Sequence, residues 1–144
     1  MTSFRRLSAT MLASPQITVA DVAAAKEQGV TLIVNNRPDG EGPDQTPGAE
    51  IESAARAAGI DYLAIPITHA GFSHPQVTRL AEALEGAKGQ VLGYCRSGTR
   101  STLLWALAEA SKGEDPDALA AAAASAGYDV SPVRPAMDAL AAAR

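Results

Sequence analysis

The residues with the clearest chemical potential are a cysteine and the polar segment that follows it, Cys95-Arg-Ser-Gly-Thr-Arg-Ser101. A buried β-strand, Val91–Tyr94, is expected to end directly before Cys95, and a helix is expected to begin a few residues later. In a tight strand-to-helix turn, successive backbone N–H groups point inward, and the helix N-terminus adds its positive end. The spacing therefore predicts a loop that binds a tetrahedral anion beside the sulfur.

Within this loop, each residue type has a chemical role. Gly98 permits the tight turn because it carries no Cβ, and Arg100 can form two parallel hydrogen bonds to a bound oxyanion. The positive field is expected to favour the thiolate form of Cys95, which is the nucleophilic form. The other residues whose N–H groups would bind the anion are Arg96, Ser97, Thr99 and Ser101. The alternative, an inert core cysteine, is disfavoured by the polar composition of the segment.

The composition indicates one globular domain and narrows its partners. The chain has 144 residues, 47% of them hydrophobic and 19% charged, and the domain is predicted to span residues 1–144. A net charge of −4 and 4% aromatic residues argue against a nucleic-acid partner. One cysteine, no secretion signal and no apolar run of about 18 residues predict a cytoplasmic protein without a membrane partner. The oligomeric state is left open, and a homo-oligomer is compatible with the sequence.

Three short apolar runs predict buried strands, which are Val30–Val34, Tyr62–Ile67 and Val91–Tyr94. Helices are expected between these strands, because a capping residue or a proline stands at the start of each helical segment. The helix starts are Thr18, Thr46-Pro47, and Ser73 or His74 ahead of Pro75. Alternation of strands and helices implies a largely parallel sheet that is covered on both faces.

The remaining segments predict one or two short edge strands and a helical C-terminal part. The edge strands are expected at Phe4–Leu7 and Thr10–Ala13, and the C-terminal helices at Ser101–Ser111, after Asp115-Pro116 and after Ser131-Pro132. The long loop 36–46 follows the carboxyl end of a buried strand. Open α/β sheets bind their ligands at this end.

The pattern Cys95-x-x-Gly-x-Arg-Ser101 resembles the anion loop that protein tyrosine phosphatases share with rhodanese sulfurtransferases. The two families differ in the spacing of this loop, since phosphatases place the arginine six residues after the cysteine. Here Arg100 lies five residues after Cys95, and this shorter spacing resembles that of the rhodaneses. A smaller loop has less room for three phosphoryl oxygens and favours a persulfide sulfur. However, the Asp-Val-Arg and Gly-His-Ile segments expected upstream in a rhodanese are absent.

Nearly the whole chain is similar to the phosphatase-like domain of beta-lactamase-hydrolase-like proteins. The segments that carry the resemblance are Phe4–Leu7, Ser14–Gln16, Asn35–Glu41, Ile65–Thr68, Tyr94–Ser101 and Ala126–Asp129. The resemblance implies an α/β fold of the protein-tyrosine-phosphatase type, with Cys95 as the nucleophile and Arg100 as the group that binds the anion. It also implies that the Ser101 hydroxyl hydrogen-bonds the sulfur and helps it to leave.

Three functions follow from the loop and from the resemblance. Members of the family that the chain resembles are described both as phosphatases and as sulfur transferases. The favoured one is hydrolysis of a phosphoester through a covalent intermediate on Cys95. The second is sulfur transfer through a Cys95 persulfide, and the third is anion binding without catalysis. The expected partner is therefore a small anion, either a phosphoester or a sulfane sulfur donor.

The general acid is where the sequence departs from the dual-specificity phosphatases that it resembles. Those enzymes place an aspartate after the strand that corresponds to Tyr62–Ile67, where this chain has Thr68-His-Ala-Gly-Phe72. His69 is a candidate acid because histidine ordinarily titrates close to neutral pH; the alternative is a solvated loop residue. Asp39 is a second candidate acid or else only a turn residue.

The other polar residues give weaker signals. Arg37 either faces the anion site or pairs with Glu41 or Asp44. His69 and His74 are the only histidines, and with one distant cysteine they do not form a recognisable zinc set. Dinucleotide-binding and Walker patterns are absent, so neither a metal nor another cofactor is expected.

Overall fold

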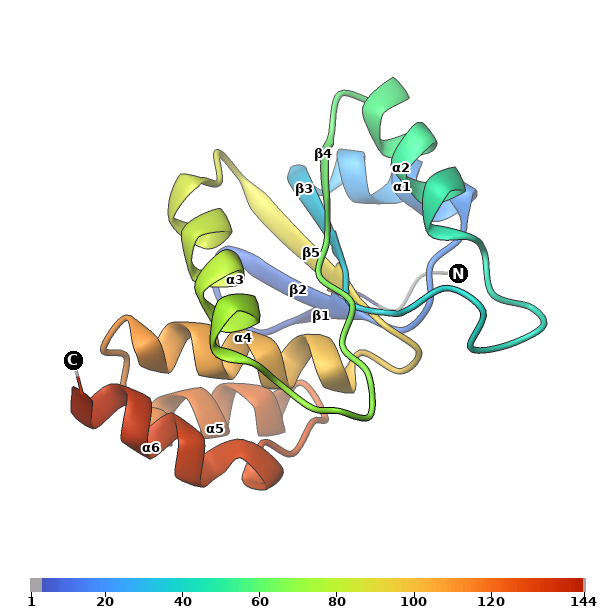
Figure 1. Ribbon diagram of the computed structural model, residues 1–144. Helices are drawn as coiled ribbons and strands as arrows, with labels where there is room; N and C mark the ends of the chain where they lie inside the picture. The colour runs from blue at the N-terminus through green and yellow to red at the C-terminus, as the bar shows by residue number, and fades with distance from the viewer. Residues whose placement is uncertain (1–3, 144) are drawn as a thin grey trace.

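A five-stranded sheet of order β1-β2-β5-β3-β4 runs through the computed structural model, which describes residues 4–143 (Figure 1). The strands are β1 (Arg5–Arg6), β2 (Met11–Ser14), β3 (Val30–Asn35), β4 (Asp61–Ala64) and β5 (Gln90–Tyr94). Strands β2 to β5 pair in parallel, and β1 pairs antiparallel with β2 at one edge. The expectation of a mostly parallel sheet is confirmed. Residues 1–3 and 144 of the predicted domain lie outside the described range.

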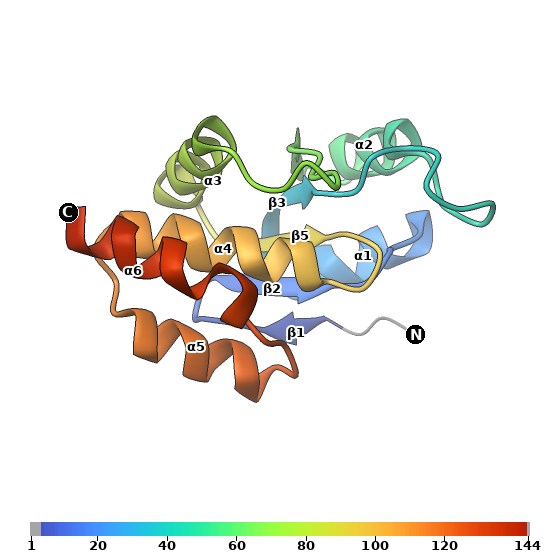
Figure 2. The same ribbon diagram turned by 60° about the horizontal axis from the view of Figure 1, so that its bottom comes forward.

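Helices cover both faces of this sheet. They are α1 (Val19–Glu27), α2 (Gly48–Ala57), α3 (His74–Gly86), α4 (Thr99–Ser111), α5 (Pro116–Ser125) and α6 (Arg134–Ala143). Helices α1 and α2 pack on one face, and α3 and α4 pack on the other (Figure 1). Helices α5 and α6 lie beside α4 and form the helical C-terminal part (Figure 2). Within residues 4–143, no helix combines the length and apolar character needed to span a membrane.

Two hydrophobic clusters, one on each face, hold the layers together. Successive side chains of a strand point to opposite faces, so Val91 of β5 joins the cluster under α3 and α4, while Leu92 joins the cluster under α1 and α2. Trp105 of α4 is buried. The central strand β5 is therefore fixed from both sides, and so is the loop that it leads into.

Two strands differ from the prediction. The segment Thr10–Ala13 was expected at an edge, but Met11–Ser14 lies inside the sheet between β1 and β5, with all four residues buried. Strand β4 ends at Ala64 rather than continuing to residue 67. Its continuation contains Pro66, which has no N–H to donate to a ladder and is tolerated at the sheet edge that β4 occupies.

Two helix starts also differ from the prediction. Helix α2 begins at Gly48, and its first N–H donates to the Asp39 carboxylate at 2.9 Å rather than to the expected cap at Thr46. The Ser131-Pro132 signal begins the 3₁₀ turn η1 (Ser131–Val133), and α6 follows only from Arg134. Pro47 is the residue directly before α2, whereas Pro132 lies in the 3₁₀ turn that precedes α6.

The parallel strands bring four loops to one edge of the sheet. The carboxyl ends of β2, β3, β4 and β5 point the same way, because these strands pair in parallel. The segments that follow them are the loop before α1, the long loop before α2, the loop before α3 and the Cys95 loop before α4. This edge collects the residues that the sequence singles out.

Candidate active site

Cys95 lies at the carboxyl end of β5, and the loop after it folds back over the sulfur. The Gly98 N–H donates to Cys95 Sγ at 3.1 Å, and Cys95 is buried. Helix α4 begins at Thr99, so the positive end of a helix of 13 residues adjoins this loop. The Ser97 hydroxyl donates to Thr99 Oγ1 at 2.9 Å, which closes the exposed side of the turn. The structure thus has the strand, turn and helix order that the sequence predicts.

A side chain from the C-terminal part packs directly against Gly98. Gly98 has a φ of 94°, in the left-handed region, and a Cβ there would lie 2.1 Å from the Tyr128 hydroxyl oxygen. That hydroxyl donates to the Ser97 carbonyl at 3.1 Å. Arg5 lies over the Tyr128 ring at 5.2 Å from its centroid and donates to the Ala126 carbonyl. Only glycine fits at position 98, for reasons of both backbone and space.

Arg100 is held by Glu41. From the sequence, Glu41 was expected only as a partner of Arg37. The Arg100 Nη1 and Nη2 atoms each donate to one Glu41 oxygen at 2.8 Å, and Nη1 also donates to the Ile67 carbonyl at 2.8 Å. The Glu41 hydrogen bonds, against burial and with help from the neighbouring Cys95, raise the pKa of Arg100 above its ordinary value. Both groups are therefore charged near neutral pH.

The same contacts make Glu41 strongly acidic. Hydrogen bonds from Arg100, opposed by burial and reinforced by Arg37, lower the pKa of Glu41 from 4.5 to about 2. Its carboxylate consequently carries no proton to donate at the pH of a cell. This excludes Glu41 as a proton donor in the cavity that it lines together with Arg100.

Arg37 pairs with Glu41, one of the two carboxylates that the sequence suggests as its partners. Its Nε donates to Glu41 Oε1 at 2.9 Å, and its Nη1 donates to Gln16 Oε1 at 3.1 Å. The side chain is only 7% exposed, and a buried guanidinium needs such partners. Arg37 therefore contacts the carboxylate that holds Arg100, and no hydrogen bond joins it to the Cys95 loop among the described residues.

Ser101 contacts an amide rather than the sulfur. Its hydroxyl donates to Asn36 Oδ1 at 2.7 Å, and Asn36 Nδ2 donates in turn to the Ile65 carbonyl at 2.9 Å. The Asn36 N–H also donates to the Tyr94 carbonyl at 2.8 Å. Asn36 thus joins the ends of β3, β4 and β5 to the first turn of α4, which was not foreseen from the sequence.

Replacing Asn36 with alanine is expected to lower the free energy of unfolding by about 2–4 kcal/mol. The substitution leaves two buried groups, the Ser101 hydroxyl and the Ile65 carbonyl, without a partner, and each such group costs about 1–3 kcal/mol. Urea denaturation measures the loss, with the exposed Ser125→Ala as the control expected to stay within about 0.5 kcal/mol. A loss below about 1 kcal/mol for Asn36→Ala would mean that this amide does not hold the strand ends.

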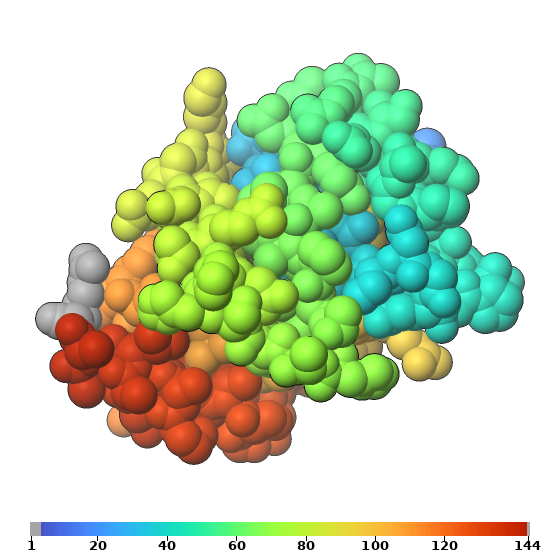
Figure 3. Space-filling view, in the orientation of Figure 1, coloured from blue at the N-terminus to red at the C-terminus, as the bar shows by residue number. Residues whose placement is uncertain are grey.

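A cavity beside the Cys95 loop brings together residues from three of the four loops. It is lined by Glu41, Thr68, His69, Arg96 and Arg100. In Figure 3, gold atoms from the loop before α4 reach the surface near the teal segment before α2 and the green segment before α3. The predicted acid His69 and the predicted anion-binding residues Arg96 and Arg100 therefore share one opening.

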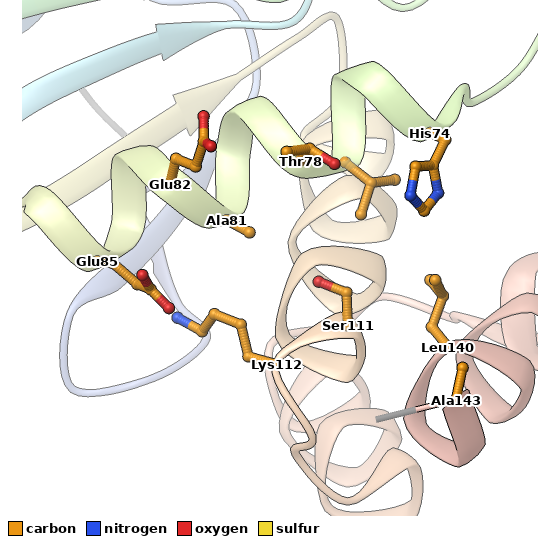
Figure 4. Close-up of a pocket in the computed structure, with 10 residues that line it drawn as sticks. His74, Thr78, Ala81, Glu82, Glu85, Ser111, Lys112, Leu140 and Ala143 are labelled. Carbon is orange, nitrogen blue, oxygen red and sulfur yellow. The ribbon is translucent and has the colours of Figure 1, made fainter.

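Two residues of interest lie elsewhere. Asp39, the second candidate acid, lines a different cavity, and its carboxylate accepts the first N–H of α2. His74 lines a cavity between α3, the end of α4 and α6 (Figure 4). The two histidines thus face different cavities, and residues 4–143 contain no cluster of three or more His, Cys, Asp or Glu able to hold a metal ion.

Known structures share this fold. A Neisseria meningitidis Z2491 protein described as a phosphatase candidate is 30% identical, with a TM-score of 0.83 over 97% of this chain and 99% of that one. Pseudomonas aeruginosa TpbA is 21% identical, with a TM-score of 0.67 over 99% of this chain and 90% of that one. Human DUSP28 is 18% identical, with a TM-score of 0.71 over 98% of this chain and 94% of that one. The tyrosine-phosphatase-like fold is confirmed.

Curated relatives match over a shorter part of their own length. The beta-lactamase hydrolase-like protein of Agrobacterium fabrum C58 is 34% identical over 108 residues, which cover 75% of this chain and 25% of that protein. Its namesake in Xylella fastidiosa Temecula1 is 40% identical over 83 residues, covering 57% of this chain and 19% of that protein. The chain spans a quarter or less of these relatives. Because the family model matches residues 3–112, the chain belongs to the phosphatase-like domains of beta-lactamase hydrolase-like proteins.

Proposed function

We propose that the protein hydrolyses a phosphoester through a covalent phosphocysteine intermediate on Cys95. The observation that carries the proposal is the Gly98 N–H directed at the Cys95 sulfur, at the start of α4 and beside Arg100. Membership of a phosphatase-like family and the likeness to the N. meningitidis phosphatase candidate support it. TpbA, which shares the fold, has been described in complex with pTyr, in agreement with a small anionic substrate.

The proposed reaction has two displacements at phosphorus. In the first, the Cys95 thiolate forms an S–P bond while the P–O bond to the leaving group breaks, and the leaving oxygen takes a proton from His69. In the second, water attacks phosphorus, the S–P bond breaks, its electron pair returns to Cys95, and the proton of the water passes to His69. The N–H groups of the loop and the guanidinium of Arg100 stabilise the negative charge on the phosphoryl oxygens in both steps.

His69 is the proton donor that remains after the other side chains of the cavity are considered. Glu41 has a pKa of about 2, and its hydrogen bonds raise the pKa of Arg100 above the ordinary value of a guanidinium. Asp39 lies in another cavity and accepts a hydrogen bond at the start of α2. His69 is also the histidine that lines the opening beside Arg100.

Replacing His69 with alanine is expected to slow hydrolysis of phenyl phosphate by about 10²-fold, because its leaving group needs a proton. Hydrolysis of p-nitrophenyl phosphate, whose leaving group needs little protonation, should change by less than about fivefold under the same principle. Steady-state kinetics with both esters measure the contrast. His74→Ala is the matched control, since that histidine faces another cavity, and it should leave both rates unchanged. An equal fall for the two esters would exclude His69 as the acid.

Sulfur transfer remains a second candidate because Arg100 lies five residues after Cys95, as in rhodaneses. In that reaction the Cys95 thiolate attacks the outer sulfur of thiosulfate, the S–S bond of thiosulfate breaks, and sulfite leaves with its electron pair. The product is a Cys95 persulfide, whose outer sulfur lies where the phosphoryl group would otherwise lie.

A parallel assay separates the candidate functions. The wild-type protein is offered p-nitrophenyl phosphate in one reaction and thiosulfate in another, followed by mass spectrometry of the intact chain. We expect phosphate release in the first and no mass gain in the second. A gain of one sulfur atom without phosphate release would replace the proposal by sulfur transfer. Tungstate binding without either reaction would identify an anion-binding module.

A further inference from the structure

We infer that Tyr128 is a positioning residue, which orients the Ser97–Gly98 peptide so that its N–H faces the Cys95 sulfur and a bound anion. The inference rests on the proposed function, because it concerns the same anion site. Tyr128 lies in the turn after α5, 31 residues beyond Ser97 in the sequence. The fold therefore brings its side chain to the Cys95 loop from a distant part of the chain.

The Ser97–Gly98 peptide is hydrogen-bonded on both of its polar sides. The Ser97 carbonyl accepts a hydrogen bond from the Tyr128 hydroxyl at 3.1 Å, and the Gly98 N–H donates to Cys95 Sγ at 3.1 Å. The C=O and the N–H of a trans peptide point in opposite directions. A donor that holds the carbonyl on the outside of the loop therefore directs the N–H towards the sulfur.

The peptides on either side have donors of their own. The Arg96 carbonyl accepts the Gln16 N–H at 3.3 Å, and the Gly98 carbonyl accepts the N–H and the hydroxyl of Thr102 at 3.0 and 2.9 Å. Within residues 4–143, the Tyr128 hydroxyl is the one hydrogen-bond donor to the carbonyl between them. The orientation of the middle peptide thus depends on this side chain.

Glycine at position 98 leaves this peptide free to turn unless something restrains it. Gly98 has a φ of 94°, and glycine populates positive and negative φ about equally readily. In the turned orientation the Ser97 carbonyl would face the sulfur, and its partial negative charge would repel both a thiolate and an oxyanion. The space taken by Tyr128 requires a glycine at this position, and the Tyr128 hydroxyl restrains the freedom that this glycine brings.

Tyr128 is itself fixed in place. It is buried, and Arg5 of β1 lies over its ring at 5.2 Å from the centroid (Figure 2). Arg5 also donates to the Ala126 carbonyl at 3.2 Å, and the Tyr128 N–H donates to the Ala123 carbonyl at 2.9 Å. Burial, opposed by Arg5 and reinforced by the nearby Cys95, raises the pKa of Tyr128 above its ordinary value. The hydroxyl therefore keeps the proton that it donates.

The test measures tungstate affinity by titration calorimetry in Tyr128→Phe, which keeps the ring and removes only the hydroxyl. We expect tungstate to bind about fivefold or more weakly, as for the loss of one hydrogen bond. Tyr62→Phe is the matched control, because the Tyr62 hydroxyl also forms one side-chain hydrogen bond, with Asn35, and lines a different cavity. This control should bind tungstate as the wild type does.

Hydrogen exchange measured by NMR gives a second readout, at the peptide itself. The Gly98 N–H is buried and bonded to the sulfur, so it exchanges only when the peptide turns or the protein unfolds. Tyr128→Phe should speed this exchange by about tenfold. The Cys95 N–H, which donates to the Ser14 carbonyl at 3.3 Å, is the internal reference and should change by less than about threefold.

Each outcome has a distinct meaning. Unchanged tungstate affinity in Tyr128→Phe would show that the ring only fills space, and would overturn the inference. Equal weakening in Tyr62→Phe, or equal acceleration at the Cys95 N–H, would also overturn it, because the loss would then be general. Absence of tungstate binding in the wild type overturns both this inference and the anion site. If Tyr128 affects binding as expected but the wild type hydrolyses no phosphoester, the proposed function fails while the positioning role stands.

Discussion

Replacing Cys95 with serine is expected to abolish hydrolysis of p-nitrophenyl phosphate, with kcat falling on the order of 10⁴-fold or more. A serine hydroxyl keeps its proton at neutral pH, and the Gly98 N–H that contacts the sulfur is a donor, which cannot remove that proton. The variant therefore lacks an activated nucleophile although its loop is intact. Initial rates across mildly acidic to neutral pH measure the effect.

Anion binding provides the control for Cys95→Ser. The backbone N–H groups and Arg100 are unchanged in this variant, so tungstate should still bind. Persistent turnover above about a tenth of the wild-type rate would exclude thiolate catalysis. If both turnover and tungstate binding are lost, Cys95→Ala provides the second variant. Recovery of binding in Cys95→Ala would attribute the loss to the serine hydroxyl and leave the thiolate mechanism in place.

Replacing Arg100 with lysine is expected to lower kcat/KM by about 10²- to 10³-fold, although the charge is kept. Arg100 contacts Glu41 with two N–H groups and Ile67 with a third. A guanidinium has five N–H groups, so two remain for an anion. A lysine ammonium presents its three donors at one point. Once it pairs with Glu41, it cannot also form two parallel bonds to a phosphoryl group.

The same chemical change at a second arginine controls for this effect. Arg56 forms a two-point contact with Glu52 on the exposed surface of α2, away from the Cys95 loop. Arg56→Lys should keep the wild-type kcat/KM, because exposed ion pairs contribute little. If Arg100→Lys stays within about threefold of the wild type, Arg100 does not bind the transferred group.

Much of the fold follows from local signals in the sequence. Val30–Val34 and Val91–Tyr94 are predicted as buried strands and lie in the middle of the sheet as β3 and β5. The Asp115-Pro116 signal predicts the start of α5 correctly. These signals are reliable because burial on both faces of a strand and capping at a helix start both act over a few residues.

The features that the sequence did not reveal depend on distant contacts. The place of Met11–Ser14 inside the sheet is set by pairing with β1 and β5, which no local pattern encodes. The first N–H of α2 is capped by Asp39, nine residues earlier. In each case the deciding partner comes from another loop or strand.

In the candidate site, too, the features set by neighbouring residues could be predicted and those set by distant contacts could not. The position of Cys95 after a strand and that of Gly98 in the turn before a helix could be predicted, because these residues lie close together in the sequence. The partner of Arg100 could not, since Glu41 becomes its neighbour only when β3 and β5 pair and bring their loops to one edge. The resemblance included the segment Asn35–Glu41, and this was the one signal in the sequence that could have pointed to Glu41.

The contact between Tyr128 and Gly98 ties the Cys95 loop to the C-terminal part of the chain. The family model ends at residue 112, whereas the ring that fills the space above Gly98 comes from residue 128. The Cys95 loop and the Tyr128 ring that packs against it thus belong to different portions of the chain. A substitution of Tyr128 can therefore change the packing of the Cys95 loop while residues 95–101 stay the same.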